Sequence, residues 1–218
     1  MINLKTKRGQ KLLAAGNWAW SLLSINFAWF LINFPVILTA IVLGSLDLNV
    51  GFYSIDLVLT AMLAIFTIPS LFAVFETVQD WQINGNKTFF KTQFINWFQM
   101  ISKFKLNVGF ALVIGLLILL NKMFFGFVFP HMFILTTTVI VIAILITTAF
   151  QIGTNSDSTV TELCLNHPFK ILAATLIFMI LLILNFILQL AFLIVICSIS
   201  LSVFCAYRLL GGRVEKND

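Results

Sequence analysis

The side chains that carry chemistry in most proteins are scarce in this chain of 218 residues. It has 8 Asp and Glu residues, 2 histidines and 3 cysteines. Cys164, Cys197 and Cys205 lack the spacing of a metal site or a disulfide framework, so we interpret them as small core residues. His131 and His167 flank one long apolar segment, and we expect them on opposite sides of a membrane. The sequence therefore predicts no metal site, no cofactor and no enzyme activity.

Four carboxylates form the one set that could act as a paired general acid and base, namely Glu76, Asp80, Asp157 and Glu162. All four lie at the ends of apolar runs, where acidic side chains commonly cap helices or form ion pairs. We prefer this structural interpretation, and an acid–base site remains the alternative.

Two amides stand out inside the first apolar run. Asn26 and Asn33 are seven residues apart, which places them on one face of a helix. They could line a path for a polar solute. Hydrogen bonding between membrane helices is the more common role of such residues.

The overall composition is that of a protein whose solvent is a lipid bilayer. Hydrophobic residues make up 61% of the chain, charged residues 10%, and the mean hydropathy is +1.07. Five runs contain no Asp, Glu, Lys or Arg: 12–46, 57–75, 106–121, 123–156 and 171–207. Several exceed the roughly 20 residues with which an α-helix crosses a membrane. The sequence predicts an all-α, polytopic membrane protein with a single membrane domain, 1–218.

The last apolar run, 171–207, decides the number of spans. As one helix it would be roughly 55 Å long, against a hydrocarbon core of about 30 Å. We therefore expect two spans that reverse between Asn185 and Gln189. The chain then has six predicted spans, at 17–44, 57–75, 106–128, 132–152, 169–187 and 189–208, with a short turn at Pro130 and His131 between the third and fourth.

The basic residues predict an orientation, because short cytoplasmic loops carry the excess of Lys and Arg. With both termini inside, 12 of the 13 basic residues are cytoplasmic and only Lys122 is outside. The outer segment 45–56 carries only the acidic Asp47 and Asp56. A five-span topology would move Arg208 and the basic residues after it outside. We predict a multi-pass protein of the plasma membrane with the N- and C-termini inside.

The most informative segment is the predicted cytoplasmic loop 76–105. Asn84 to Asn86 is a turn signal, and Thr88 could cap a helix that follows it. Aromatic and aliphatic residues then recur at the spacing of one helix face, namely Phe90, Phe94, Trp97, Phe98 and Ile101. Such a short amphipathic helix is typical of the membrane interface, where it lies among the lipid headgroups. The alternative is a docking helix that binds a protein partner.

Short motifs along nearly the whole chain resemble those of a bacterial family. They are Asn26 to Leu31 with Phe34-Pro35, Ile68 to Ala73 with Asp80-Trp81, Thr88 to Lys91 with Phe94 and Phe98, and Asn166-His167-Pro168. Together they resemble the YesL-like integral membrane proteins, a family without an assigned biochemical function. The stretch after the first span departs from the family pattern, which has more small residues and Thr there.

The resemblance implies a role but no catalytic residues. Members of the family are associated with carbohydrate uptake, particularly with ABC importers of sugars. We therefore expect an accessory membrane subunit that binds the permease subunits of an oligosaccharide ABC importer in the bacterial cell membrane. The helix at Phe90 to Ile101 would make the contact. The alternative is a self-sufficient transporter or channel for small solutes, with Asn26 and Asn33 along its path.

Overall fold

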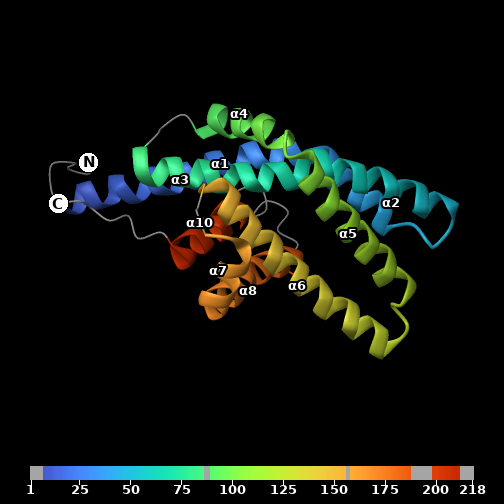
Figure 1. Ribbon diagram of the computed structural model, residues 1–218. Helices are drawn as coiled ribbons and strands as arrows, with labels where there is room; N and C mark the ends of the chain where they lie inside the picture. The colour runs from blue at the N-terminus through green and yellow to red at the C-terminus, as the bar shows by residue number, and fades with distance from the viewer. Residues whose placement is uncertain (1–6, 86–88, 156–157, 188–197, 212–218) are drawn as a thin grey trace.

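The computed structural model is helical, and it contains no strand within residues 7–85, 89–155, 158–187 and 198–211, which it describes. Its elements are α1 (Lys7–Gly44), α2 (Val50–Met62), the π-helix η1 (Leu63–Thr67), α3 (Ile68–Asn84), α4 (Phe89–Ile101), α5 (Phe104–Met123), α6 (Val128–Gly153), α7 (Val160–Asn166), α8 (Pro168–Ile187) and α10 (Ser198–Leu210) (Figure 1). Four stretches are long and apolar enough to cross a membrane: Gly9–Gly44, Val50–Asn84, Phe104–Met123 and Val128–Gly153. The pair α7 and α8, bent by 101°, would make a fifth span. The predicted all-α class is confirmed in the described residues, with four or five stretches apolar enough to span a membrane.

Two long helical stretches pack against each other and form the spine of the molecule (Figure 1). One is α1, and the other is the continuous helix formed by α2, η1 and α3. At 36 and 35 residues, their apolar stretches are each more than 50 Å long, at about 1.5 Å per residue. A hydrocarbon core of about 30 Å cannot contain either helix when it stands upright. In a membrane of that thickness, part of the spine would have to tilt or extend beyond the core.

The second helix is longer at both ends than the predicted span 57–75. It begins at Val50, after Asn49, whose side-chain oxygen accepts a hydrogen bond of 3.0 Å from the Phe52 amide. Asp56 consequently lies within α2 and not in an outer loop. The helix ends at Gly85, which has a φ of +59°. Glu76 and Asp80, which are half-buried, consequently lie within α3 and not in a loop.

The connection between the third and fourth spans also differs from the prediction. Helix α5 ends at Met123 and α6 begins at Val128, so the turn consists of residues 124–127. Pro130 lies in the first turn of α6, where the missing amide hydrogen costs no helical hydrogen bond. The expected turn at Pro130 and His131 is therefore wrong by about one helical turn.

The last part of the chain is described in two helices. Pro168 opens α8, which runs to Ile187, so Asn185 is still helical and the reversal does not begin there. Gln189, Cys197 and the first half of the predicted sixth span fall in 188–197, outside the described residues. Helix α10 has 13 residues, fewer than a full span requires. The count of six spans stays a prediction.

Helix α3 lies at the centre of the packing. It contacts α1, α4, α5, α6 and α10. Every residue from Ile68 to Phe75 is buried, which is typical of a helix surrounded by other helices. The closest approach is to α6, where a Cβ on Gly153 would lie 2.8 Å from the Phe72 backbone oxygen. This buried part of α3 also belongs to the helix against which α4 packs.

Candidate functional site

A break in the hydrogen bonding of the spine receives a side chain from α4. Pro69 has no amide hydrogen, so it cannot donate to the backbone oxygen of Ile65, four residues earlier. The indole Nε1 of Trp97 donates to this oxygen at 3.0 Å. The Trp97 ring also stacks on Phe66, with centroids 5.8 Å apart and planes inclined by 19°. Helix α4 is thereby fixed to the π-helical turn, a type of irregularity found frequently at functional sites.

A buried polar network lies just beyond this break. The Asn33 Nδ2 of α1 donates to Ser70 Oγ and to the Trp29 backbone oxygen, both at 2.9 Å. Thr67 Oγ1 donates to Asn33 Oδ1 at 2.7 Å, and Ser70 Oγ donates to the Thr67 backbone oxygen at 2.9 Å. Asn33 therefore ties α1 to the segment between η1 and α3.

The side of α4 that faces the core is partly polar. Its buried residues are Phe89, Gln93, Asn96 and Met100, which share one helix face. Gln93 Nε2 donates to the Ser70 backbone oxygen at 3.2 Å, and Asn96 Nδ2 donates to Thr77 Oγ1 at 3.2 Å. These two bonds join the middle of α4 to α3, and the Trp97 bond joins it to η1. Thr88 lies outside the described residues, so its predicted capping role has no structural counterpart here.

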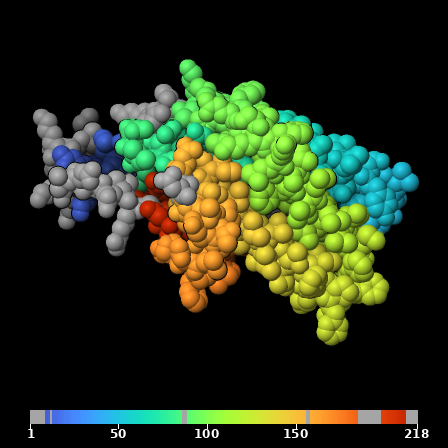
Figure 2. Space-filling model, viewed as in Figure 1, coloured from blue at the N-terminus to red at the C-terminus, as the bar shows by residue number. Residues whose placement is uncertain are grey.

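The predicted aromatic face is divided between packing and exposure. Phe90 is 43% exposed and Phe98 is 65% exposed, whereas Phe94, Trp97 and Ile101 are half-buried. Helix α4 packs against α1 and α3, and its predicted position at a membrane interface stays a prediction. In the space-filling view it forms part of the outer surface of the molecule (Figure 2).

Neighbouring rings join this face to α1. The Phe27 and Phe90 ring centroids are 6.3 Å apart, and Phe90 is 5.2 Å from Phe94. Trp97 lies 6.3 Å from Phe94 and 4.6 Å from Phe98. We call these five residues, Phe27, Phe90, Phe94, Trp97 and Phe98, the aromatic ridge. The sequence identified four of them, and Phe27 was missed because its contact with α4 is tertiary.

Asn26, the second predicted intramembrane amide, contacts a different helix from Asn33. Its Oδ1 accepts hydrogen bonds from the Ile199 and Ser200 amides, at 3.0 and 3.1 Å. These amides belong to the first described turn of α10. Ser200 Oγ also donates to the Leu22 backbone oxygen at 2.8 Å. Asn26 thus holds the start of α10 against α1, and both amides serve contacts between helices.

The three predicted carboxylates that the structure describes lie on two separate helices, α3 and α7. Glu76 and Asp80 are one turn apart on α3, and Asp157 lies outside the described residues. Glu162 accepts the Thr159 amide hydrogen at 2.8 Å, and Thr159 Oγ1 accepts that of Glu162 at 3.2 Å. This capping box starts α7 and lowers the pKa of Glu162. Among the described residues, no group of three His, Cys, Asp or Glu residues could hold a metal ion.

His167 lines a polar pocket of about 330 Å³ at the junction of α3, α6, α7 and α10. Gln79, Thr154, Ser158 and Tyr207 contribute the other polar side chains. Gln79 Nε2 donates to the Thr154 backbone oxygen at 3.2 Å, which links α3 to the end of α6. His131 lies in the first turns of α6, so the two histidines belong to separate parts of the fold.

No protein-family model, curated protein or solved structure matches this chain. The resemblance to the YesL-like family therefore stays a prediction, and the aromatic ridge is the feature on which a functional proposal can rest.

Proposed function

We propose that this chain is an accessory membrane protein that acts by binding another membrane protein through the aromatic ridge. The supporting observation is that part of the ridge is exposed while hydrogen bonds hold its helix, α4, on the spine. Phe90 and Phe98 expose large apolar surfaces, and Gln93, Asn96 and Trp97 hold α4 on the spine.

A fixed aromatic surface is well suited to binding. Aromatic residues contribute many of the dominant contacts in protein interfaces. A surface that is ordered before binding loses little conformational entropy when a partner docks. For exposed aliphatic side chains elsewhere on the molecule, contact with lipid is a sufficient explanation of their exposure. The ridge differs from them because a polar, hydrogen-bonded face supports it.

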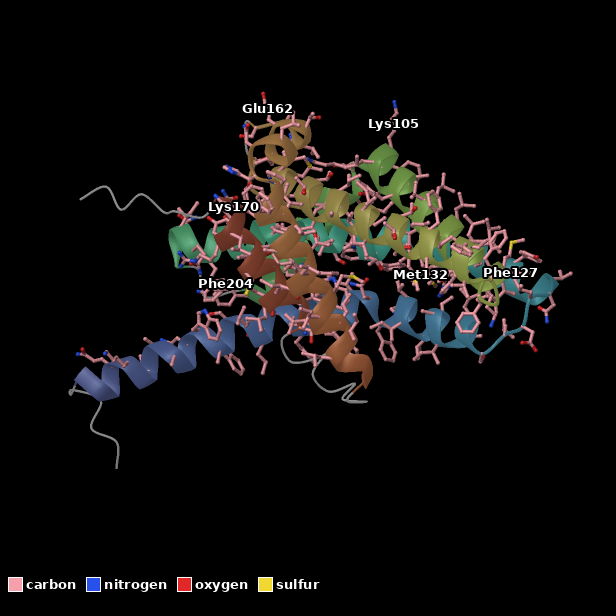
Figure 3. The ribbon with its side chains drawn as sticks, turned by 90° about the horizontal axis from the view of Figure 1, so that it is seen from below. Lys105, Phe127, Met132, Glu162, Lys170 and Phe204 are labelled. Atoms are coloured by element: carbon pink, nitrogen blue, oxygen red, sulfur yellow. The ribbon has the colours of Figure 1, made fainter. Side chains whose placement is uncertain are left out.

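The nature of the partner rests on the resemblance alone. The YesL-like motifs support the permease subunits of an oligosaccharide ABC importer as the partner, in a bacterial plasma membrane. The basic residues support an orientation with both termini inside. Lys105 stands at the start of α5 (Figure 3) and Lys122 near its end, so the two lysines lie at opposite ends of one helix. In this orientation the ridge belongs to the inner half of the protein.

The proposal assigns no catalytic step to the chain. It also differs from the alternative of a transporter or channel built around Asn26 and Asn33. Both amides are buried and bonded to other helices, and these bonds account for them without a solute.

Co-purification tests the proposal. The chain is solubilised in mild detergent from cells that carry the importer, and the recovered subunits are identified by mass spectrometry. We expect permease subunits with the wild type and at least tenfold less with Phe90→Ala plus Phe98→Ala, about 1.4 kcal/mol in binding. Phe129→Ala plus Phe133→Ala is the matched control, since both rings are exposed on α6. Equal recovery with the ridge variant and the wild type would contradict the proposal.

A further inference from the structure

A cleft of about 520 Å³ lies between the end of α1, the start of α2 and the end of α5. It is near the end of the molecule where Phe127 and Met132 are labelled in Figure 3. Most of its walls are apolar, including Leu43, Phe52 and Leu59. Its size is that of a pocket for a small organic ligand.

Two polar side chains of α5 also line the cleft. Lys122 Nζ lies 6.0 Å from the centroid of the Phe52 ring, and no carboxylate within the described ranges forms an ion pair with it. The buried Oδ1 of Asn121 has no hydrogen-bond partner in the described part of the chain. The cleft therefore offers one cation and one unused acceptor beside a large apolar surface.

We propose that this cleft binds a single anionic phospholipid with a glycerol headgroup. An acyl chain would cover the apolar walls, and Lys122 would neutralise the phosphate. A headgroup hydroxyl would donate to Asn121 Oδ1. Lys122 is the penultimate residue of α5, so it stands at the end of a span, at the level where lipid headgroups lie. A soluble anion would leave the apolar walls uncovered, which favours a lipid.

Asp56 limits where the phosphate can bind. It lies on the face of α2 that carries Phe52 and Leu59, and its buried Oδ1 has no partner among the described residues. A carboxylate repels a phosphate at short range. The phosphate is thus expected beside Lys122, one turn nearer the end of the molecule than Asp56. Asp56→Asn should leave lipid binding intact.

Photo-crosslinking tests this site in the full chain. Phosphatidylglycerol and phosphatidylcholine with identical diazirine-bearing acyl chains are each added to nanodiscs of phosphatidylcholine that contain the protein. Labelled peptides are then mapped by mass spectrometry. We expect about five-fold more labelling by phosphatidylglycerol within 40–44 and 118–125, the gain typical of one cation near a membrane surface. Lys122→Met should abolish this preference and Lys122→Arg should keep it, while Lys170→Met at the other end serves as the charge control.

Equal labelling by both lipids would overturn the proposal, as would a preference that survives Lys122→Met. Loss of labelling in the presence of glycerol 3-phosphate at the concentration of the lipid would also overturn it, because recognition would then need only the phosphate. Ala40→Phe provides a second variant that leaves the charge in place. It should fill the cleft and remove labelling of 118–125 by both lipids.

Discussion

The indole of Trp97 donates its hydrogen bond to the Ile65 backbone oxygen, the acceptor to which Pro69 cannot donate. One proline thus creates a binding position in the spine, and one tryptophan from the following helix occupies it. The relationship places the aromatic ridge at a fixed point relative to the centre of the fold.

Trp97→Phe should weaken the docking of α4 while it preserves an aromatic ring against Phe66. The loss of this one hydrogen bond should cost up to about 1 kcal/mol. Amide hydrogen exchange in nanodiscs should show faster exchange in α4. Trp20→Phe is the control, because Trp20 is 66% exposed. Unchanged exchange in α4 would show that the bond contributes nothing to docking.

Pro69→Ala should reduce the cost of Trp97→Phe, since the substituted residue supplies an amide hydrogen for the Ile65 oxygen. A double-mutant cycle on the free energy of unfolding in SDS measures the coupling. We expect a coupling of roughly 0.5–1 kcal/mol. Strictly additive effects would mean that Pro69 and Trp97 do not share the Ile65 oxygen.

Asn33→Leu and Asn26→Leu should destabilise different parts of the molecule. Asn33→Leu removes the acceptor of Thr67 Oγ1 and one of the two partners of Ser70 Oγ, and it should cost about 1–3 kcal/mol in unfolding free energy. Asn26→Leu should speed hydrogen exchange in the first turn of α10 and leave η1 unaffected. Solute flux into liposomes that is lost specifically in these variants would instead favour a transport path.

Gly153→Ala should be strongly destabilising, because its Cβ would lie 2.6 Å from the Phe75 Cβ and 2.9 Å from the Glu76 amide nitrogen. We expect a cost of about 1–3 kcal/mol from overpacking against backbone. Gly109→Ala is the matched helical control, with no atom within 4 Å of the added carbon. It should be neutral or stabilise α5 by up to about 1 kcal/mol. Equal effects of both changes would argue against the close contact of α3 with α6.

The capping box should make the stability of α7 depend on pH. Because the hydrogen bonds from Thr159 lower the pKa of Glu162 in the folded protein, the ionised carboxylate stabilises α7 above its ordinary pKa. This contribution is lost as the pH falls through the lowered pKa. Hydrogen exchange in α7, corrected for the intrinsic rate, should be slower in the wild type than in Glu162→Gln at neutral pH. The difference should disappear in acid, and a difference independent of pH would contradict this role.

The helical membrane class was predictable because apolar runs of span length have few other solutions. The short helix at Phe89–Ile101 followed from its periodicity and the glycine before it. Helix ends were less predictable. Residues 50–56 and 76–84 contain charges but no proline, so the chain continues as helix through both segments.

The packing of α4 could not be predicted from its pattern. The aromatic residues indicated one apolar face, but Gln93 and Asn96 occupy buried positions because Ser70 and Thr77 provide their partners. These partners are 23 and 19 residues away in the sequence, and no local rule pairs them. The three-residue spacing of Gln93 and Asn96 was the only local signal, and it identifies a face without saying what covers it.

Site-specific photo-crosslinking in cells tests the central claim, a membrane partner at the aromatic ridge, most directly. Benzoylphenylalanine replaces Phe98 in the ridge or, as a control, Leu112 of α5, which is 58% exposed. The account predicts a discrete protein adduct from position 98, identified as a permease subunit, and only lipid adducts from position 112. Lipid adducts alone from position 98, in cells that contain the importer, would contradict it.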